Sequence, residues 1–159
     1  MRSYNGITLL TQRQVEGLLK MREAERYESP LPISHKRIAL VVDDQKDLSD
    51  SLAVLIEALG HEALTAYDAP TALALAREFR PQIVITDVSM PGNSGVSLAN
   101  CVRSDPQLTN CRLVALSGFT EELFGPGAAD AFDDWVIKPV SVETLNKVIS
   151  RSPLPRANV

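Results

Sequence analysis

The sequence predicts an α/β protein in which helices cover both faces of a parallel sheet. From residue 38 onward, short apolar runs alternate with longer segments whose apolar residues recur at helical spacing. The runs lie at residues 38–42, 63–66, 83–86, 113–116 and 135–137. The first, third and fourth runs are almost continuously apolar, which is typical of central strands, so the second and fifth are expected at the edges. About five strand–helix units with right-handed crossovers would form three layers.

A helix is predicted after each apolar run. The apolar stripes consist of Leu48, Leu52, Leu55, Ile56 and Leu59 in the first helix, Leu73, Ala76 and Phe79 in the second, Val96, Leu98, Ala99 and Val102 in the third, and Leu145, Val148 and Ile149 in the last. Gly60 lies in the C-terminal cap position of the first helix, and Asp68 and Ser141 are N-terminal caps of the second and last. A short fourth helix is predicted after Thr120, ended by Gly-Pro-Gly at 125–127.

The two ends of the chain lie outside this alternation. The spacing predicts one helix over residues 11–27, with Val15, Leu18 and Leu19 inward, and a proline-containing linker over 28–32. We therefore expect an N-terminal helical extension with its linker over residues 1–35, a folded domain over 36–151 and an irregular tail over 152–159. The extension could hold a homodimer, dock on the domain as a regulatory flap, bind one particular partner, or have no function.

Composition excludes several classes of protein. With 159 residues, of which 45% are hydrophobic and 23% charged, the chain suits one domain with a packed core. A net charge of −4 provides no cationic field for nucleic acid, and no apolar run is long enough to span a membrane or to serve as a signal peptide, so a cytoplasmic location is expected. Cys101 and Cys111 are expected as a reduced pair in the core, and His35 and His61 lack neighbouring zinc ligands.

Three aspartates directly follow two of the predicted central strands. Asp43 and Asp44 come after the first apolar run, and Asp87 comes after the third. Because functional sites in doubly wound sheets form beyond the carboxyl ends of the strands, we expect these side chains to share one pocket. Carboxylates so placed repel one another unless they bind a cation, and oxygen ligands alone favour Mg²⁺. Helix capping alone accounts for one such aspartate but poorly for three.

A hydroxyl and an ammonium group follow two more of the predicted strands at this edge. Ser117 closes the fourth apolar run and Lys138 the fifth. Taken separately, Ser117 would be an ordinary turn residue and Lys138 a solvated surface charge. Carboxylates, a metal ion, a hydroxyl donor and a fixed cation are together suited to binding a transferring phosphoryl group.

With these residues, the sequence resembles the receiver domain of two-component response regulators. The matching pieces are Val41-Val42-Asp43-Asp44, Asp87-Val88-Ser89-Met90-Pro91-Gly92 with Gly95, Ala115-Leu116-Ser117-Gly118 and Asp134-Trp135-Val136-Ile137-Lys138-Pro139. Their order and separations fit the family over roughly residues 37–151. The resemblance implies a flavodoxin-like doubly wound (βα)5 three-layer sandwich whose parallel strands are ordered 2-1-3-4-5.

The resemblance also implies a metal-dependent phosphoacceptor. Asp87 would be the phosphoacceptor, a carboxylate nucleophile that forms an acyl phosphate. Mg²⁺ would be bound directly by Asp44, Asp87 and the backbone carbonyl of Ser89, and through water by Asp43. The Lys138–Pro139 peptide bond is expected to be cis, as in the family.

Three further residues would act in the transfer and in the change that follows it. Lys138 would pair with Asp87 before transfer and with the phosphoryl oxygens afterwards, while Ser117 would donate a hydrogen bond to one of those oxygens and move inward. Trp135 stands where the family usually has a Tyr or Phe that rotates with this movement; simple packing on an edge strand is an equally open interpretation. Ser117 in place of Thr, and Asn93 at a loop position that is usually apolar, are other departures.

The expected function is that of a stand-alone phosphorylation-dependent switch or phosphorelay intermediate. A sensor histidine kinase or a histidine phosphotransfer protein would donate the phosphoryl group, and output would pass by contact with an unknown protein or by onward transfer, without turnover of an external substrate. Two alternatives stay open: a receiver-fold interaction module that is not phosphorylated, and an aspartyl-phosphate-type phosphatase. The phosphatase pattern places two aspartates one residue apart on the nucleophile strand, whereas Asp43 and Asp44 are adjacent and Asp87 is on another strand.

Overall fold

The computed structural model describes residues 3–4, 7–8, 36–92 and 94–151. The chain divides into two units, Met1–His35 and Lys36–Val159. In the first unit, β1 (Ser3–Tyr4) and β2 (Ile7–Thr8) pair in antiparallel fashion. Strands of two residues carry no alternation by which a sequence could reveal them. The helix expected over 11–27 and the linker over 28–32 lie outside the described residues.

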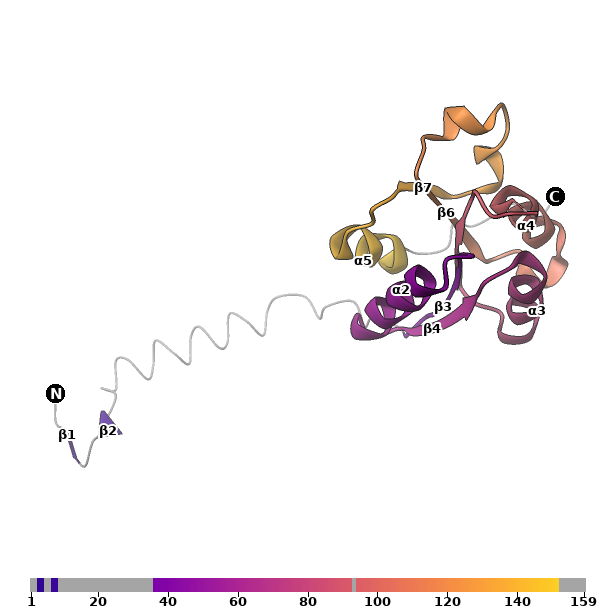
Figure 1. The fold of residues 1–159 in the computed structure, drawn as a ribbon. Helices are drawn as coiled ribbons and strands as arrows, with labels where there is room; N and C mark the ends of the chain where they lie inside the picture. Colours follow the sequence, from indigo (N-terminus) through magenta and orange to yellow (C-terminus); the bar gives the residue numbers. More distant parts are fainter. Residues whose placement is uncertain (1–2, 5–6, 9–35, 93, 152–159) are drawn as a thin grey trace. The chain divides into compact units, whose positions relative to one another are not determined.

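Five parallel strands form the sheet of the second unit (Figure 1). They are β3 (Ile38–Val42), β4 (Glu62–Ala66), β5 (Ile83–Asp87), β6 (Arg112–Ser117) and β7 (Asp134–Ile137). Their order across the sheet is β4-β3-β5-β6-β7, so the second and fifth apolar runs are the edges. This confirms the predicted fold class and the predicted order 2-1-3-4-5. Each strand agrees with its apolar run to within one residue at either end.

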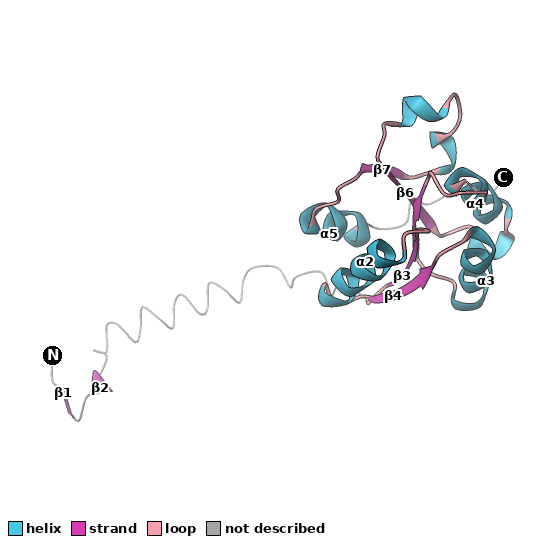
Figure 2. Cartoon of the chain, in the orientation of Figure 1, coloured by secondary structure: helices cyan, strands magenta, loops and turns pink. Residues whose placement is uncertain are grey.

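Helices cover the two faces of this sheet, as the strand–helix alternation predicts (Figure 2). The helices are α2 (Lys46–Ala58), α3 (Ala69–Phe79), α4 (Gly95–Ser104) and α5 (Val142–Ser150), with a 3-10 turn η1 (Pro106–Leu108) after α4. Side chains of β3 alternate between the faces: Leu40 packs with residues of α3 and α4, and Val41 packs with residues of α2 and α5. The core therefore has two halves, one on each side of the sheet.

The predicted caps and helix ends are largely confirmed. Asp68 accepts a hydrogen bond from the backbone N–H of Thr71 at the start of α3, and Ser141 does the same for Thr144 at the start of α5. Gly60 adopts a φ of 89°, which favours glycine, just after α2. Phe79, the last residue of α3, is 41% exposed, although the helical stripe placed it with buried residues.

The connection between β6 and β7 differs from the prediction. In place of the short fourth helix it contains two 3-10 turns, η2 (Glu121–Phe124) and η3 (Ala129–Ala131). The side chain of Thr120 makes no capping hydrogen bond, and Gly125, at a φ of 87°, ends η2 after four residues. One turn is too short to propagate as an α-helix.

An arginine on α4 holds this connection in place. The guanidinium of Arg103 donates to the carbonyl oxygens of Ala131 and Cys111, at 2.8 and 2.7 Å, and to a carboxylate oxygen of Asp133 at 2.7 Å. Cys111 is buried, but Cys101 is exposed, so the expectation that both thiols lie in the core is wrong for Cys101. Within the described ranges, no helix has both the length and the apolar character needed to cross a membrane.

Candidate functional site

The sheet brings the three predicted aspartates together. Asp43 and Asp44 follow β3, and Asp87 is the last residue of the neighbouring strand β5, with Val42 opposite Thr86 in the register. One carboxylate oxygen from each of the three lies within 4.8 Å of the others. Asp43 is fully buried and Asp87 is 6% exposed, whereas Asp44 is exposed. The cluster is therefore a pocket of negative charge that opens to solvent at Asp44.

Lys138 pairs with two of these carboxylates from the end of β7. Its Nζ lies 2.8 Å from Oδ2 of Asp43 and 3.4 Å from Oδ1 of Asp87. Burial alone would lower the pKa of Lys138, but the hydrogen bond to Asp43 and the charges of Asp87 and Asp43 outweigh it, so this pKa lies above its ordinary value. Lys138 is thus a protonated cation at neutral pH. Three carboxylates against one ammonium leave the described cluster with excess negative charge.

Backbone groups orient two of the carboxylates. The N–H of Gln45 donates to Oδ1 of Asp43 at 2.9 Å, and the N–H of Ser89 donates to Oδ1 of Asp87 at a longer 3.4 Å. Asp43 is thus held by a backbone donor and by Lys138, and Asp87 is held less tightly. A loosely held carboxylate at a metal-compatible site is free to change partners.

Ser117 lies at the carboxyl end of β6, one position beyond the residue that pairs with Asp87. Its hydroxyl is buried and accepts a hydrogen bond from the backbone N–H of Phe119 at 3.0 Å. The backbone N–H of Lys138 donates to the carbonyl of Ser117 at 2.8 Å, and the Lys138–Pro139 bond is cis, as predicted. Ser117 and Lys138 are therefore neighbours at the same edge as the aspartates.

Gly95 has a structural reason to be glycine that its motif alone does not reveal. It begins α4, and a Cβ placed there would lie 2.1 Å from the backbone oxygen of Asp87. Its N–H donates to the carbonyl of Val88 at 3.0 Å. The absence of a side chain therefore allows the start of α4 to pack directly on the backbone that carries Asp87.

Trp135 belongs to an aromatic cluster that sequence reasoning missed. Its indole N–H donates to the carbonyl oxygen of Phe119 at 3.0 Å, and its ring contacts those of Phe124 and Phe132 at centroid distances of 5.4 and 5.7 Å. The same Phe119 donates its N–H to Ser117. One residue thus connects the buried hydroxyl to the indole, across a sequence separation that no spacing rule predicts.

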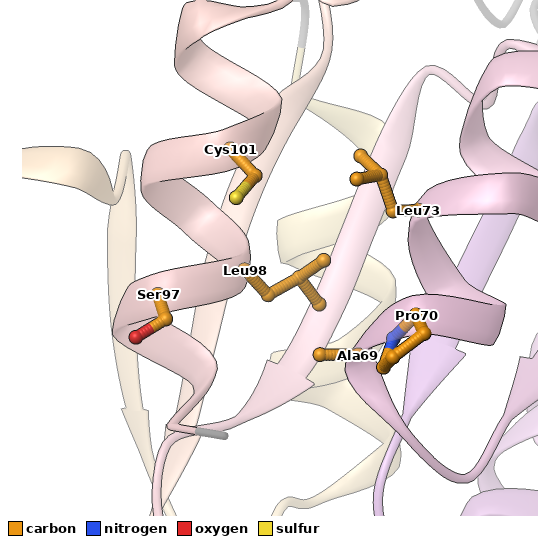
Figure 3. A pocket seen from close by; sticks show the side chains of 6 residues that line it. All are labelled: Ala69, Pro70, Leu73, Ser97, Leu98 and Cys101. Carbon is orange, nitrogen blue, oxygen red and sulfur yellow. The ribbon is translucent and has the colours of Figure 1, made fainter.

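Two hollows lie on opposite faces of the sheet. A groove of about 460 Å³ begins at Lys138 and runs along α2 and the loop before α5; it is lined by Leu48, Ser51, Leu52, Leu55, Leu116, Lys138, Pro139 and Val140. A smaller hollow of about 260 Å³ lies between α3 and α4; it is lined by Ala69, Pro70, Leu73, Ser97, Leu98 and Cys101 (Figure 3). The smaller hollow, and another of about 480 Å³ next to η2 and the start of α4, include no residue of the charged cluster, whereas the groove includes Lys138.

The fold and the cluster define a doubly wound α/β protein with an acidic site at the carboxyl ends of its central strands. The family model of the response regulator receiver domain matches residues 39–150. The chain therefore belongs to the response regulator receiver family, whose members are signalling modules of two-component systems that interact with histidine kinases or phosphotransfer proteins.

Solved structures and curated relatives agree with this assignment. The chemotaxis response regulator CheY4 of Vibrio cholerae is 30% identical with a TM-score of 0.65, covering 72% of this chain and 96% of that one. A CheY-like receiver domain from Methylobacillus flagellatus is 28% identical with a TM-score of 0.66, covering the same shares.

Curated relatives are longer than the matched region. The hybrid signal transduction histidine kinase D of Dictyostelium discoideum is 30% identical over 146 residues, which are 91% of this chain and 9% of the relative. The probable transcriptional regulatory protein TcrX of Mycobacterium tuberculosis is 35% identical over 105 residues, 65% of this chain and 44% of the relative. The match thus spans less than half the length of either relative.

Proposed function

We propose that this protein is a phosphorylation-dependent switch or phosphorelay intermediate that accepts a phosphoryl group on Asp87 from a phosphohistidine in a Mg²⁺-dependent reaction. The observation that carries the proposal is the pairing of one ammonium group, that of Lys138, with two members of a three-carboxylate cluster. The donor would be a sensor histidine kinase or a histidine phosphotransfer protein in the cytoplasm. Output would pass by protein contact or onward transfer, without turnover of an external substrate.

The donor atoms suit Mg²⁺. All three clustered ligands are carboxylate oxygens, two of them buried and one exposed to the entering ion, and their charge exceeds what Lys138 neutralises. Asp44, Asp87 and the carbonyl of Ser89 would hold the metal directly, and Asp43 would hold it through water. When bound, Mg²⁺ supplies positive charge to the oxygens of the transferring group.

The chemistry assigned to Asp87 is nucleophilic substitution at phosphorus. A carboxylate oxygen of Asp87 forms a bond to phosphorus as the P–N bond of the phosphohistidine breaks, and the electron pair of that bond remains on the imidazole nitrogen, which takes up a proton if it leaves as the anion. Lys138, protonated at neutral pH, exchanges its contact with Asp87 for one with a phosphoryl oxygen. The hydroxyl of Ser117 already accepts from Phe119, so its own proton is free to bind a second phosphoryl oxygen.

Movement of Ser117 would reach the surface through Phe119. If Ser117 turns toward the phosphoryl group, the hydrogen bond that its hydroxyl accepts from the N–H of Phe119 changes. The carbonyl oxygen of Phe119 accepts a hydrogen bond from the indole of Trp135, so a shift of Phe119 would also move the indole. Trp135 is therefore assigned as the reporter of the switch. Its contacts with Phe124 and Phe132 would change together with it.

The groove beside Lys138 is assigned to the phosphodonor. A donor protein must bring an imidazole within bonding distance of Asp87, and the groove begins at the lysine that contacts this carboxylate. Its remaining lining is mostly aliphatic, from Leu48 to Val140, which suits the apolar face of a helix on the donor.

The phosphoacceptor assignment is tested by intact-protein mass spectrometry with acetyl phosphate and Mg²⁺. Wild type should gain one phosphoryl group, and Asp87→Asn should gain none. Asp105→Asn is the matched control: this aspartate pairs with Arg77 of α3 and belongs to no part of the carboxylate cluster, so its replacement should leave the addition unchanged. A wild-type protein that neither gains mass nor binds Mg²⁺ would leave a receiver-fold interaction module in place of the switch.

The extension over residues 1–35 is proposed as a separate element next to a receiver domain of residues 36–151, with 152–159 as a tail. A homodimer held by the extension is the specific form of this proposal. Measuring mass in solution before and after deletion of residues 1–34 tests it, and an unchanged oligomeric state would remove the dimer.

A further inference from the structure

A second charged cluster lies at the amino end of β7, opposite the carboxylate pocket. Asp134, the first residue of the strand, has a side chain that is 12% exposed. One of its oxygens accepts from Nε of Arg112 at 2.8 Å and from a second nitrogen of the same guanidinium, and the other oxygen accepts from Arg151. Arg112 lies on β6, and Arg151 follows α5. One largely covered carboxylate therefore joins a central strand to the end of the last helix.

Arg37, near the beginning of the receiver domain, also binds the end of α5. The guanidinium of Arg37 donates to the carbonyl oxygens of Ser150 and Arg151. Arg37 is the second residue of the unit Lys36–Val159, and its backbone N–H donates to Nδ1 of His61 at 3.4 Å. Arg151 is thus bound through its carbonyl to Arg37 and through its side chain to Asp134. We call Arg37, Arg112, Asp134 and Arg151 the arginine latch.

Strand β7 connects the arginine latch to the carboxylate pocket. Its four residues span about 13 Å, and Lys138, which pairs with Asp43 and Asp87, comes directly after them. The strand is hydrogen-bonded to β6 along its length, from Asp134 to Ile137. When Lys138 changes its partner, the movement is therefore passed to β7. The other end of this strand is held by the ion pairs of Asp134 with Arg112 and Arg151.

We propose that the arginine latch couples phosphorylation of Asp87 to the segment of residues 36–38 at which the first 35 residues join the receiver. This inference rests on the proposed function. In the structure, the contact of Lys138 with Asp87 and the contact of Arg151 with Asp134 are present together. When Lys138 exchanges Asp87 for phosphoryl oxygens, the shift of β7 weakens the contact of Asp134 with Arg151, and the hold of Arg37 on the end of α5 weakens with it. By reciprocity, opening the latch favours the phosphorylated arrangement.

Amide hydrogen exchange tests the coupling on the full chain. The probe is Mg²⁺ with beryllium fluoride, which mimics a phosphoryl group on a carboxylate. The N–H of Ile38 donates to the side chain of Gln82 at 2.7 Å, so a peptide containing Ile38 has an exchange-sensitive amide next to Arg37. In wild type, adding the probe should accelerate exchange in this peptide and in the peptide ending at Arg151. Adding Mg²⁺ alone should not.

Two latch variants and one matched control complete the test. Arg151→Gln, whose native side chain is 47% exposed, should exchange quickly near Ile38 without the probe and should bind beryllium fluoride about threefold more tightly than wild type. Arg37→Gln should do the same. Arg77→Gln, whose native side chain is 57% exposed and pairs with Asp105 after α4, should behave as wild type.

The outcomes separate the two proposals. If wild type binds the probe but exchange near Ile38 does not change, or if both latch variants bind the probe with wild-type affinity, the coupling is wrong and the phosphoacceptor assignment stands. If wild type does not bind the probe at all and Asp87→Asn is indistinguishable from it, the proposed function fails, and the coupling fails with it.

Discussion

The two ends of the receiver's sheet both collect charged side chains, but they balance them differently. At the carboxyl end, three carboxylates share one lysine. At the amino end, one carboxylate, that of Asp134, is shared by two arginines, and Asp133 pairs with Arg103 nearby. Arginine–carboxylate pairs with several hydrogen bonds fix the relative positions of the elements that they join. Clustered carboxylates repel one another, and a bound cation relieves this repulsion. The difference indicates that the carboxyl end is arranged for binding and the amino end for holding strands and helices together.

The largest expected effect comes from removing Asp134, the carboxylate that two arginines share at the amino end of the sheet. Asp134→Ala takes away the partner that Arg112 and Arg151 have in common, so the free energy of unfolding should fall by about 3 kcal/mol. Urea denaturation measures this change. Glu62→Ala, at the exposed pair with Lys36, should cost less than about 1 kcal/mol. Equal losses from the two variants would remove the distinction between the clusters.

At the carboxyl end the largest effect should be on rate. Lys138→Gln removes the cation that contacts Asp87, and phosphorylation by acetyl phosphate should slow by about 100-fold because charge on the phosphoryl oxygens is no longer stabilised. Single-turnover mass spectrometry gives the rate. Lys147→Gln, at an exposed position on α5, is the control and should react as wild type. A Lys138 variant that reacts at the wild-type rate would contradict the assignment of this residue.

Removing charge from the crowded cluster should stabilise the protein. Asp44→Asn relieves repulsion at the mouth of the pocket, so without Mg²⁺ the free energy of unfolding should rise by about 0.5 kcal/mol. Asp47→Asn in the first turn of α2 should have the opposite sign, because an acid there favours the helix. Added Mg²⁺ should stabilise wild type and leave the Asp44 variant unchanged. Denaturation with and without Mg²⁺ distinguishes these cases.

The smallest expected effect concerns His61, near the amino ends of the strands. Burial, and then the charge of Arg37, lower the pKa of His61 below its ordinary value of 6.5. The unfolded chain therefore binds more protons than the folded one at acid pH, so the free energy of unfolding should be level above pH 6.5 and should fall as the pH drops below it. His61→Gln should flatten this part of the stability profile. An identical profile in the variant would show that other groups cause the loss.

The sequence was sufficient for the parts of the fold that depend on apolar patterning. Continuous apolar runs predicted β3, β5 and β6 as central strands, and the aspartates at their ends converged as the parallel topology requires. The connection after β6 was predicted wrongly because Thr120 and the acids after it resemble a helix start. A helix needs length to offset the entropy of nucleation, and Gly125 removes that length.

Contacts between distant polar groups could not be predicted. Nothing in the local sequence relates Asp134 to Arg37 or Arg151, because charge pairs have no period along the chain. The position of Cys101 shows the same limit in a helix. The buried face of α4 is filled by neighbours such as Leu98 and Val102, so the thiol is left outside, and only the orientation of the helix decides this.

Phe119 connects the buried hydroxyl to the indole with its backbone alone. Its N–H donates to Ser117 and its carbonyl accepts from Trp135, while the residue is 58% exposed. Any residue other than proline supplies these two backbone groups. The identity of the side chain at this position is therefore free to suit whichever protein approaches the surface. Under the proposed function, partner choice and signal transmission would therefore change independently at this residue.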